Sequence, residues 1–88
     1  MAKEKVTKVR DGDTFETNKR KRAVRLANVD TPEKGQTGYL KAKKALEQMI
    51  LGEEVTVETV ARDKYKRAVA NVKQGRASVN KAMKKHEK

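Results

Sequence analysis

Two short stretches of this basic chain hold acidic residues at spacings suited to chemistry. The first is DGDT, residues 11–14, and the second is DTPE, residues 30–33. Hard cations such as calcium bind carboxylate and carbonyl oxygens. If the fold brings them together, Asp13, Asp30 and the Thr31 carbonyl would form part of a calcium shell, with waters filling the other positions.

The DGDT stretch also fits a purely structural role. It lies between VTKV and FET, which alternate between apolar and polar residues as strands do. Asp11-Gly12 would then supply the positive φ angles of a tight type I′ hairpin turn. Taken alone, the stretch is compatible with Asp13 as a polar turn residue and with Asp13 as a cation ligand.

The DTPE stretch has a structural alternative as well. Thr31 suits an N-cap, Pro32 a first helical residue, and Glu33 an acid favoured by the helix dipole. Against a helix, Gly35 and Gly38 follow closely, and each would cost roughly 1 kcal/mol in a helix interior. We therefore expect a loop in which Pro32 keeps Thr31 extended, because the residue before proline avoids the α region.

Basic residues suited to phosphate binding lie in two other stretches. In AVRLANV the strand pattern directs Arg25 away from the apolar face. In DKYKR, Lys64, Tyr65 and Arg67 share a loop before the next strand. Arg25 and Arg67 could meet across one phosphate through bidentate hydrogen bonds. Lys64 and Tyr65 would then serve a neighbouring phosphate, although a solvated basic loop is the alternative.

Hydrophobic periodicity predicts the elements that must position these side chains. Apolar residues at spacings of three and four, followed by Gly52, predict an amphipathic helix over residues 39–51. Period-two runs predict strands on both sides of this helix. The strands are VTKV, FET, AVRLANV, EVTVETV, RAVANV and ASV, and a weak last helix begins near Ser78 or Asn80.

The order of these elements predicts the fold class. Short strands with one inserted helix suit a small, partly open β-barrel of the OB type. We expect a mainly β fold with helices (α+β), namely a five-stranded OB-fold barrel with one main helix between strands 3 and 4 and a short C-terminal helix. No Pro/Gly/Ser-rich linker divides the chain, so residues 1–88 are expected to form one domain. Residues 81–88 are expected to fray, because only Ala82 and Met83 anchor them.

Composition restricts the classes of partner. Lys and Arg number 23 against 12 Asp and Glu, which gives a formal net charge of +11. This excess favours polyanions, nucleic acid first among them, with a solubility-driven surface as the alternative. The absence of cysteine excludes disulfides and Cys-based zinc sites. No apolar run approaches the roughly 20 residues of a membrane span, so we expect no membrane partner.

Five motifs, taken in order and at their approximate spacing, resemble the staphylococcal nuclease (thermonuclease) family over nearly the whole chain. They are VRDGDTF, VRLANVDTPE, GYLKAKKAL, DKYKRAVANV and SVN. The resemblance implies an OB-fold barrel with helices. It also implies a calcium-dependent phosphodiesterase that acts on DNA and RNA and leaves 3′-phosphate ends.

The resemblance assigns a role to each candidate residue. The metal-binding residues would be Asp13, Asp30 and Thr31; the catalytic residues Arg25, Glu33 and Arg67; and the phosphate-binding residues Lys64 and Tyr65. In these roles Glu33 activates or positions the attacking water, and the two arginines stabilise charge on the phosphate. Contacts centred on phosphate carry little base information, so we expect binding without sequence preference.

Two departures from the family pattern bear on activity. Lys66 stands where the family commonly has glycine, and a positive φ there would cost of order 1 kcal/mol and displace Arg67. The chain also stops soon after Asn80, so we expect no counterpart of the family's C-terminal helical region and its aromatic residues. Because base stacking is worth ~1–3 kcal/mol per base, we expect weak nucleotide affinity and low catalytic efficiency.

The leading expectation is therefore a small, monomeric, calcium-dependent nuclease. A non-catalytic nucleic-acid-binding OB-fold module is the main alternative, and a protein-interaction module is a third. The start of the chain, MAKEKVTK, has no apolar run. The chain as given is expected to be cytoplasmic, or secreted if a signal peptide has been removed.

Overall fold

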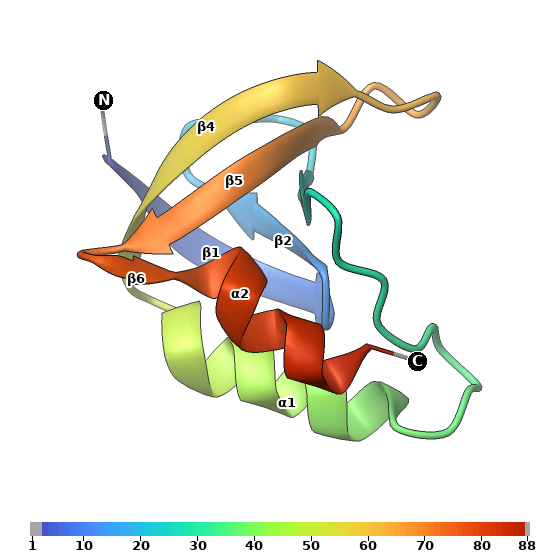
Figure 1. Ribbon diagram of the computed structural model, residues 1–88. Coiled ribbons are helices and arrows are strands. Elements are labelled where there is room, and N and C mark those ends of the chain that lie inside the picture. Colours follow the sequence, from blue (N-terminus) through green and yellow to red (C-terminus); the bar gives the residue numbers. More distant parts are fainter. Residues whose placement is uncertain (1–2, 88) are drawn as a thin grey trace.

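The computed structural model describes residues 3–87 and combines six strands with two α-helices in that part of the chain (Figure 1). The order along the chain is strands, a helix, strands and a helical end, as predicted. The elements are β1 (Lys3–Asp11), β2 (Thr14–Thr17), β3 (Val24–Leu26), α1 (Tyr39–Ile50), β4 (Glu54–Arg62), β5 (Ala68–Gln74), β6 (Ala77–Ser78), α2 (Val79–Met83) and the 3₁₀ helix η1 (Lys84–His86).

The first five strands pair in a closed ring. β1 is antiparallel to β2 and β4, β2 to β3, and β4 to β5. The parallel pairing of β3 with β5 completes the ring, and β6 extends it as a hairpin with β5. The fold is thus mainly β with two helices, an α+β arrangement in which the main helix follows the third strand as predicted.

The core lies inside the ring and beneath it, where the helices pack (Figure 1). Alternate residues of the strands point inward, and Phe15, Val24 and Leu26 are fully buried. α1 contributes Leu46 and Ile50 from one face, as its spacing predicted. This helix ends before Gly52, whose φ of 81° confirms the predicted C-terminal glycine. No helix within residues 3–87 is both long and apolar enough to span a membrane.

The turn between β1 and β2 forms as a hairpin, but the predicted type I′ geometry is wrong. Neither Asp11 nor Gly12 has a positive φ. Instead, the N–H of Asp13 donates to Oδ1 of Asp11 at 3.2 Å and closes the turn. Gly12 is required for close packing, because a Cβ atom there would lie 2.7 Å from both the Oγ1 of Thr31 and the Cβ of Ala42.

The C-terminal segment is tied to the ring by Asn80. Its Nδ2 donates to the carbonyl oxygens of Ala27 and Ala70, both at 3.0 Å, and its Oδ1 accepts from the N–H of Val72 at 2.7 Å. Of the two predicted caps, Ser78 and Asn80, the helix uses Ser78, whose Oγ accepts the N–H of Lys81. The fraying predicted for residues 81–88 concerns motion and stays a prediction; residue 88 lies outside the described residues.

Candidate functional site

Five of the predicted site residues line one surface hollow of about 310 Å³. It opens where the loop between β3 and α1 and the loop between β4 and β5 lie on the same side of the ring (Figure 1). Its lining consists of Arg25, Glu33, Asp63, Lys64, Tyr65, Arg67 and Val69. The fold therefore brings together side chains from three separate stretches of the sequence.

β3 places Arg25 in the lining of this hollow. Its neighbours Val24 and Leu26 are completely buried, while the side chain of Arg25 keeps 27% of its surface exposed. In register, Arg25 faces Thr14 of β2 on one side and Val69 of β5 on the other. The predicted outward direction of Arg25 is confirmed, and the strand pairing sets it between the DGDT and DKYKR stretches.

Two of the predicted oxygen donors, the carboxylates of Asp13 and Asp30, lie beside the same guanidinium group. Nη2 of Arg25 lies 3.4 Å from Oδ2 of Asp13 and 3.8 Å from Oδ1 of Asp30. The N–H of Thr31 donates to Oδ2 of Asp13 at 3.3 Å, and the hydroxyl of Thr14 donates to its Oδ1 at 3.0 Å. Arg25 thus supplies the positive charge that lets the two carboxylates stay close.

The environment of Asp13 disfavours its ionised form, so its pKa is raised. Burial raises its pKa above the ordinary value, and the carboxylate of Asp11 beside it raises the pKa further. The hydroxyl of Thr14 and the charge of Arg25 oppose this rise without cancelling it. A second positive charge near Asp13 would favour its ionised form.

The donor set fits a hard cation. Asp13, Asp30 and the carbonyl of Thr31 offer only oxygen, and the buried Oγ1 of Thr31 has no hydrogen-bond partner within residues 3–87. In the same part of the chain, no group of three His, Cys, Asp or Glu residues could hold an ion. The protein's share would therefore be two carboxylates and the carbonyl, with water or a phosphate oxygen completing the shell.

Glu33 reaches the hollow from the loop before α1. The predicted loop is confirmed, because α1 begins at Tyr39 and no helix starts at Thr31. The N–H of Glu33 donates to Oε1 of Gln36 at 2.8 Å, and the N–H of Gln36 donates back to the carbonyl of Glu33 at 2.9 Å. These two bonds hold the backbone of Glu33 and leave its exposed side chain at the edge of the hollow.

Asp63 organises the DKYKR loop, a role that the sequence interpretation missed. Its Oδ1 accepts the N–H groups of Tyr65 and Arg67, both at 2.9 Å, and its Oδ2 accepts Nε of Arg67 at 2.5 Å. Burial raises the pKa of Asp63, but these bonds from Arg67 and Tyr65 outweigh it and lower the pKa. Lys66 has a positive φ of 64°, the condition under which we expected Arg67 to be displaced, yet Arg67 lines the hollow together with Arg25.

Tyr65 stands at the rim with two cations against its ring. Nζ of Lys64 lies 5.2 Å from the ring centroid, and Cζ of Arg67 lies 5.3 Å from it. These are cation–π distances. Tyr65 as a residue is 62% exposed, so it is open to a ligand beside the basic side chains.

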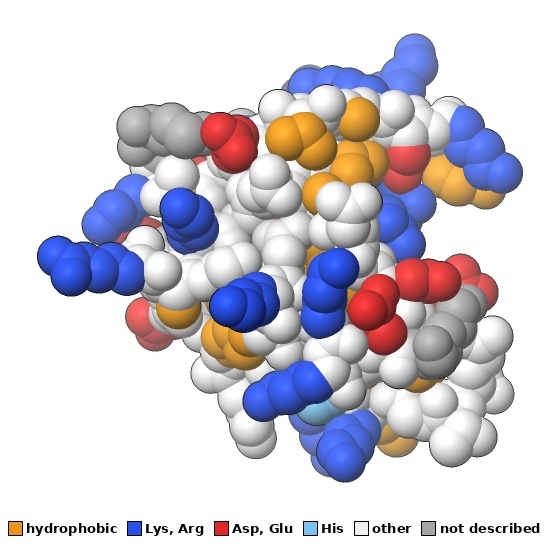
Figure 2. All heavy atoms as spheres, viewed as in Figure 1, with side chains coloured by type: hydrophobic (Ala, Val, Ile, Leu, Met, Phe, Trp, Pro, Cys, Tyr) orange, Lys and Arg blue, Asp and Glu red, His pale blue; other side chains and the backbone are white. Residues whose placement is uncertain are grey.

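Glu87 is a second residue that sequence reasoning missed. Its Oε2 accepts the backbone N–H of Asp30 at 3.1 Å, so the end of the chain holds the loop that carries Asp30. In Figure 2 a group of acidic side chains lies beside this C-terminal end, on a face that also carries many scattered Lys and Arg side chains. No local signal could have revealed the contact, because the partners lie 57 residues apart in the sequence. By contrast, an Asp side chain in a turn commonly accepts the backbone N–H of the residue two positions later. The Asp at the start of DKYKR was therefore a local signal for the role of Asp63.

Comparison with known proteins gives consistent matches. The family model described as "Staphylococcal nuclease homologue" matches residues 23–86. A Haemophilus influenzae protein named "Uncharacterized endonuclease" is 33% identical over 79 residues, which cover 86% of this chain and 44% of the relative. A protein of the same name from Escherichia coli O157:H7 is 37% identical over 70 residues, which cover 77% of this chain and 46% of the relative.

The chain thus spans less than half the length of these relatives. The family match nevertheless contains most of the candidate residues, from Arg25 through Arg67. Together with the relatives' similarity, this match confirms the family that the motifs predicted. The chain belongs to the staphylococcal nuclease family.

Proposed function

We propose that the chain is a calcium-dependent nuclease that hydrolyses phosphodiester bonds of single-stranded DNA or RNA and leaves 3′-phosphate ends. The main support is the convergence of Arg25, Glu33 and Arg67 on one hollow, with two carboxylates within 4 Å of the Arg25 guanidinium. Family membership supports a nuclease. The closed ring of strands fits an OB-type barrel, whose flanking loops are a usual place for oligonucleotides.

The two arginines fit the reacting phosphate. A guanidinium group binds phosphate oxygens through paired hydrogen bonds and keeps its charge at any working pH. Arg67 is fixed by Asp63 through its Nε, which leaves its terminal nitrogens for the phosphate. Arg25 and Arg67 would therefore stabilise the negative charge that builds on the phosphate oxygens as water attacks phosphorus.

Glu33 fits the general base. Its carboxylate would take the proton from the water as the new P–O bond forms, and a positioned base contributes about 10²–10⁴-fold to rate. The bond between phosphorus and the 5′ oxygen then breaks, and that oxygen takes a proton from solvent. The phosphate stays on the 3′ oxygen of the preceding nucleotide.

Asp13, Asp30 and the Thr31 carbonyl would hold the calcium ion. Bound there, calcium supplies a Lewis acid that polarises a phosphoryl oxygen. In the structure Arg25 contacts both carboxylates, which keeps them side by side before the ion arrives. We further propose that the chain acts as a monomer. We also propose that it binds without sequence preference, because contacts to phosphate carry no sequence information directly.

The test is cleavage of a labelled single-stranded DNA in calcium and in chelator. We expect cleavage in calcium, products whose 3′ ends respond to a 3′-phosphatase, and none of these products in chelator. A folded protein at high concentration that leaves the DNA intact in calcium would overturn the nuclease proposal. If that protein still bound the DNA, with affinity falling steeply as salt rises, the non-catalytic binding module would take its place.

A further inference from the structure

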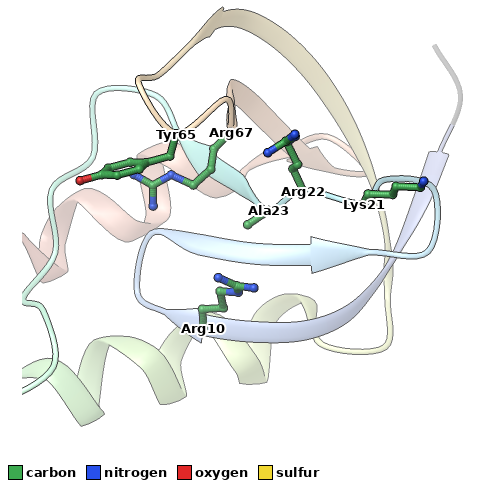
Figure 3. A pocket seen from close by; sticks show the side chains of 6 residues that line it. All are labelled: Arg10, Lys21, Arg22, Ala23, Tyr65 and Arg67. Carbon is green, nitrogen blue, oxygen red and sulfur yellow. The ribbon is translucent and has the colours of Figure 1, made fainter.

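A second hollow adjoins the candidate site on the side of Tyr65 and Arg67. These two side chains line both hollows, so the hollows meet there. The second has a volume of about 370 Å³ and a lining of Arg10, Lys21, Arg22, Ala23, Tyr65 and Arg67 (Figure 3). Four of these six residues are cationic and none is acidic.

We call Arg10, Lys21 and Arg22 the basic groove. In Figure 3, Tyr65 and Lys21 mark its two ends, with Arg22 between them and Arg10 across β2. Lys21 and Arg22 are exposed and take part in none of the ion pairs within residues 3–87. Arg10 is paired with Glu16 at 2.6 Å. The free charge of the groove therefore comes from Lys21 and Arg22.

The cationic surface continues beyond this hollow. A third hollow of about 220 Å³ shares Lys21 and Arg22 and adds Arg20, Arg62 and Ala68 to its lining. Positive side chains thus follow one another from the candidate site, past Tyr65, along the turn between β2 and β3. A single small anion needs only one such group, whereas a strand of nucleic acid presents a series of phosphates.

We propose that the basic groove binds the phosphates of the nucleic-acid strand that flank the phosphate being cleaved. This inference rests on the proposed function, which puts the reacting phosphate at Arg25 and Arg67. Arg67 also lines the second hollow, so a strand that passes through the candidate site can continue into the groove. Tyr65, with its exposed ring at the junction, suits a base stacked between the two phosphates. An acidic protein partner is a poorer match, because interface centres are rich in large apolar side chains and Ala23 and Tyr65 alone are apolar or aromatic here.

The test compares two double variants that remove the same charge from different surfaces. The groove variant is Lys21→Gln/Arg22→Gln, and the control is Lys44→Gln/Lys81→Gln, whose residues are exposed on α1 and α2. Arg10 is left intact, so that Glu16 keeps its partner. Binding of a fluorescent 12-nucleotide single strand is measured by anisotropy at several salt concentrations, in chelator, where calcium-dependent cleavage cannot occur.

For single strands, the slope of log K against log salt changes by about 0.7 per phosphate contact. We expect the groove variant to have a slope smaller in magnitude by about 1.4 than wild type, and the control to keep the wild-type slope. Equal slopes in all three proteins, or an equal loss in both variants, would overturn the groove. Circular dichroism spectra confirm that each variant is folded.

The same experiment separates this proposal from the nuclease proposal. A wild-type protein that fails to cleave in calcium, while the groove variant alone loses slope in chelator, overturns the nuclease and retains the groove as a binding site. A wild-type protein that cleaves, with a groove variant of unchanged slope, retains the nuclease and overturns the groove.

Discussion

At the residue scale, Asp13 links the fold to the proposed chemistry. It is buried at the end of the first hairpin and accepts hydrogen bonds from Thr14, Thr31 and Arg25. Burial and the neighbouring Asp11 raise its pKa, so its charge is poorly compensated in the protein alone. A bound cation would supply the missing compensation, and stability should therefore respond to calcium through this residue.

Calcium is expected to stabilise the wild type but not an Asp13→Asn variant. A ligand at 100 times its Kd raises the free energy of unfolding by about 2.7 kcal/mol, and loss of one of two ligand carboxylates should remove most of that increment. Urea unfolding with and without calcium measures it. Glu53→Gln, a change at an exposed acid away from the hollow, should keep the full increment. An Asp13→Asn variant with the wild-type increment would place the ion elsewhere.

At the element scale, the β4–β5 loop and the helix α2 help to position the site residues. The β4–β5 loop holds Arg67 through Asp63 and passes through a left-handed residue, Lys66. The α2 end holds the ring through Asn80, whose amide joins β5 to the loop after β3. The stability of each connection can be tested by one substitution.

Replacing Lys66 by glycine is expected to raise the free energy of unfolding by up to about 1 kcal/mol. The left-handed conformation costs a non-glycine residue roughly 1–2 kcal/mol in the folded state, and glycine removes this strain. Glycine also gives the unfolded chain more conformational freedom, which offsets part of the stabilisation. Chemical denaturation measures the change. A loss of stability in Lys66→Gly would contradict the φ of 64° at this position.

Asn80→Ala is expected to lower the free energy of unfolding by about 3 kcal/mol. The change removes the side-chain partner of the Val72 N–H and of the Ala27 carbonyl in the interior, and each unsatisfied buried group costs about 1–3 kcal/mol. The carbonyl of Ala70 also loses a bond from Asn80 but keeps the N–H of Ala27 at 2.8 Å. Asn71→Ala is the matched control, because Asn71 is exposed on the neighbouring strand and makes a long 3.4 Å bond to Glu58. This control should stay within about 0.5 kcal/mol of wild type. Similar losses in the two variants would contradict the anchoring role of Asn80.

Sequence patterns predicted the elements better than their junctions. The amphipathic helix and the alternating strands follow from local periodicity, and the direction of Arg25 follows from its strand. The geometry of the first turn could not be predicted in this way, because Gly12 packs closely against Thr31 and Ala42, which are distant in sequence. The partners of Asn80 and the contact of Glu87 with Asp30 likewise join distant segments. Such contacts have no local signature in a single sequence.

At the scale of the whole molecule, acidic residues are outnumbered by basic ones, so a buried carboxylate that pairs with a base affects the stability of the whole domain. The chain has a net charge of +11, so its folded form repels itself except where acids pair with bases. One well-enclosed pair joins Glu4 of β1 to Arg20 in the turn after β2, with both guanidinium contacts at 2.8 Å. The hydroxyl of Thr17 donates to the same carboxylate at 2.8 Å.

The stability conferred by Glu4 is expected to disappear in acid. Burial raises its pKa, but the bonds from Arg20 and Thr17 outweigh burial and lower the pKa below the ordinary 4.5. A lowered folded-state pKa gives stability that is present above 4.5 and is lost as the pH falls through the folded value. Wild type should therefore exceed Glu4→Gln in free energy of unfolding at neutral pH. Measured from about pH 6 to about pH 3, the difference should stay constant above about pH 4.5 and shrink below it. A difference that is constant across this range would contradict the pairing.

The central claim is that the hollow between Arg25 and Arg67 is where phosphodiester bonds are cleaved, with Glu33 as base. It is tested most directly by kcat/KM on single-stranded DNA in calcium for wild type, Glu33→Gln and Glu53→Gln. We predict a fall of about 10²–10⁴-fold for Glu33→Gln, with unchanged DNA binding in chelator, and wild-type activity for Glu53→Gln. A Glu33→Gln protein that cleaves as fast as wild type would contradict the claim.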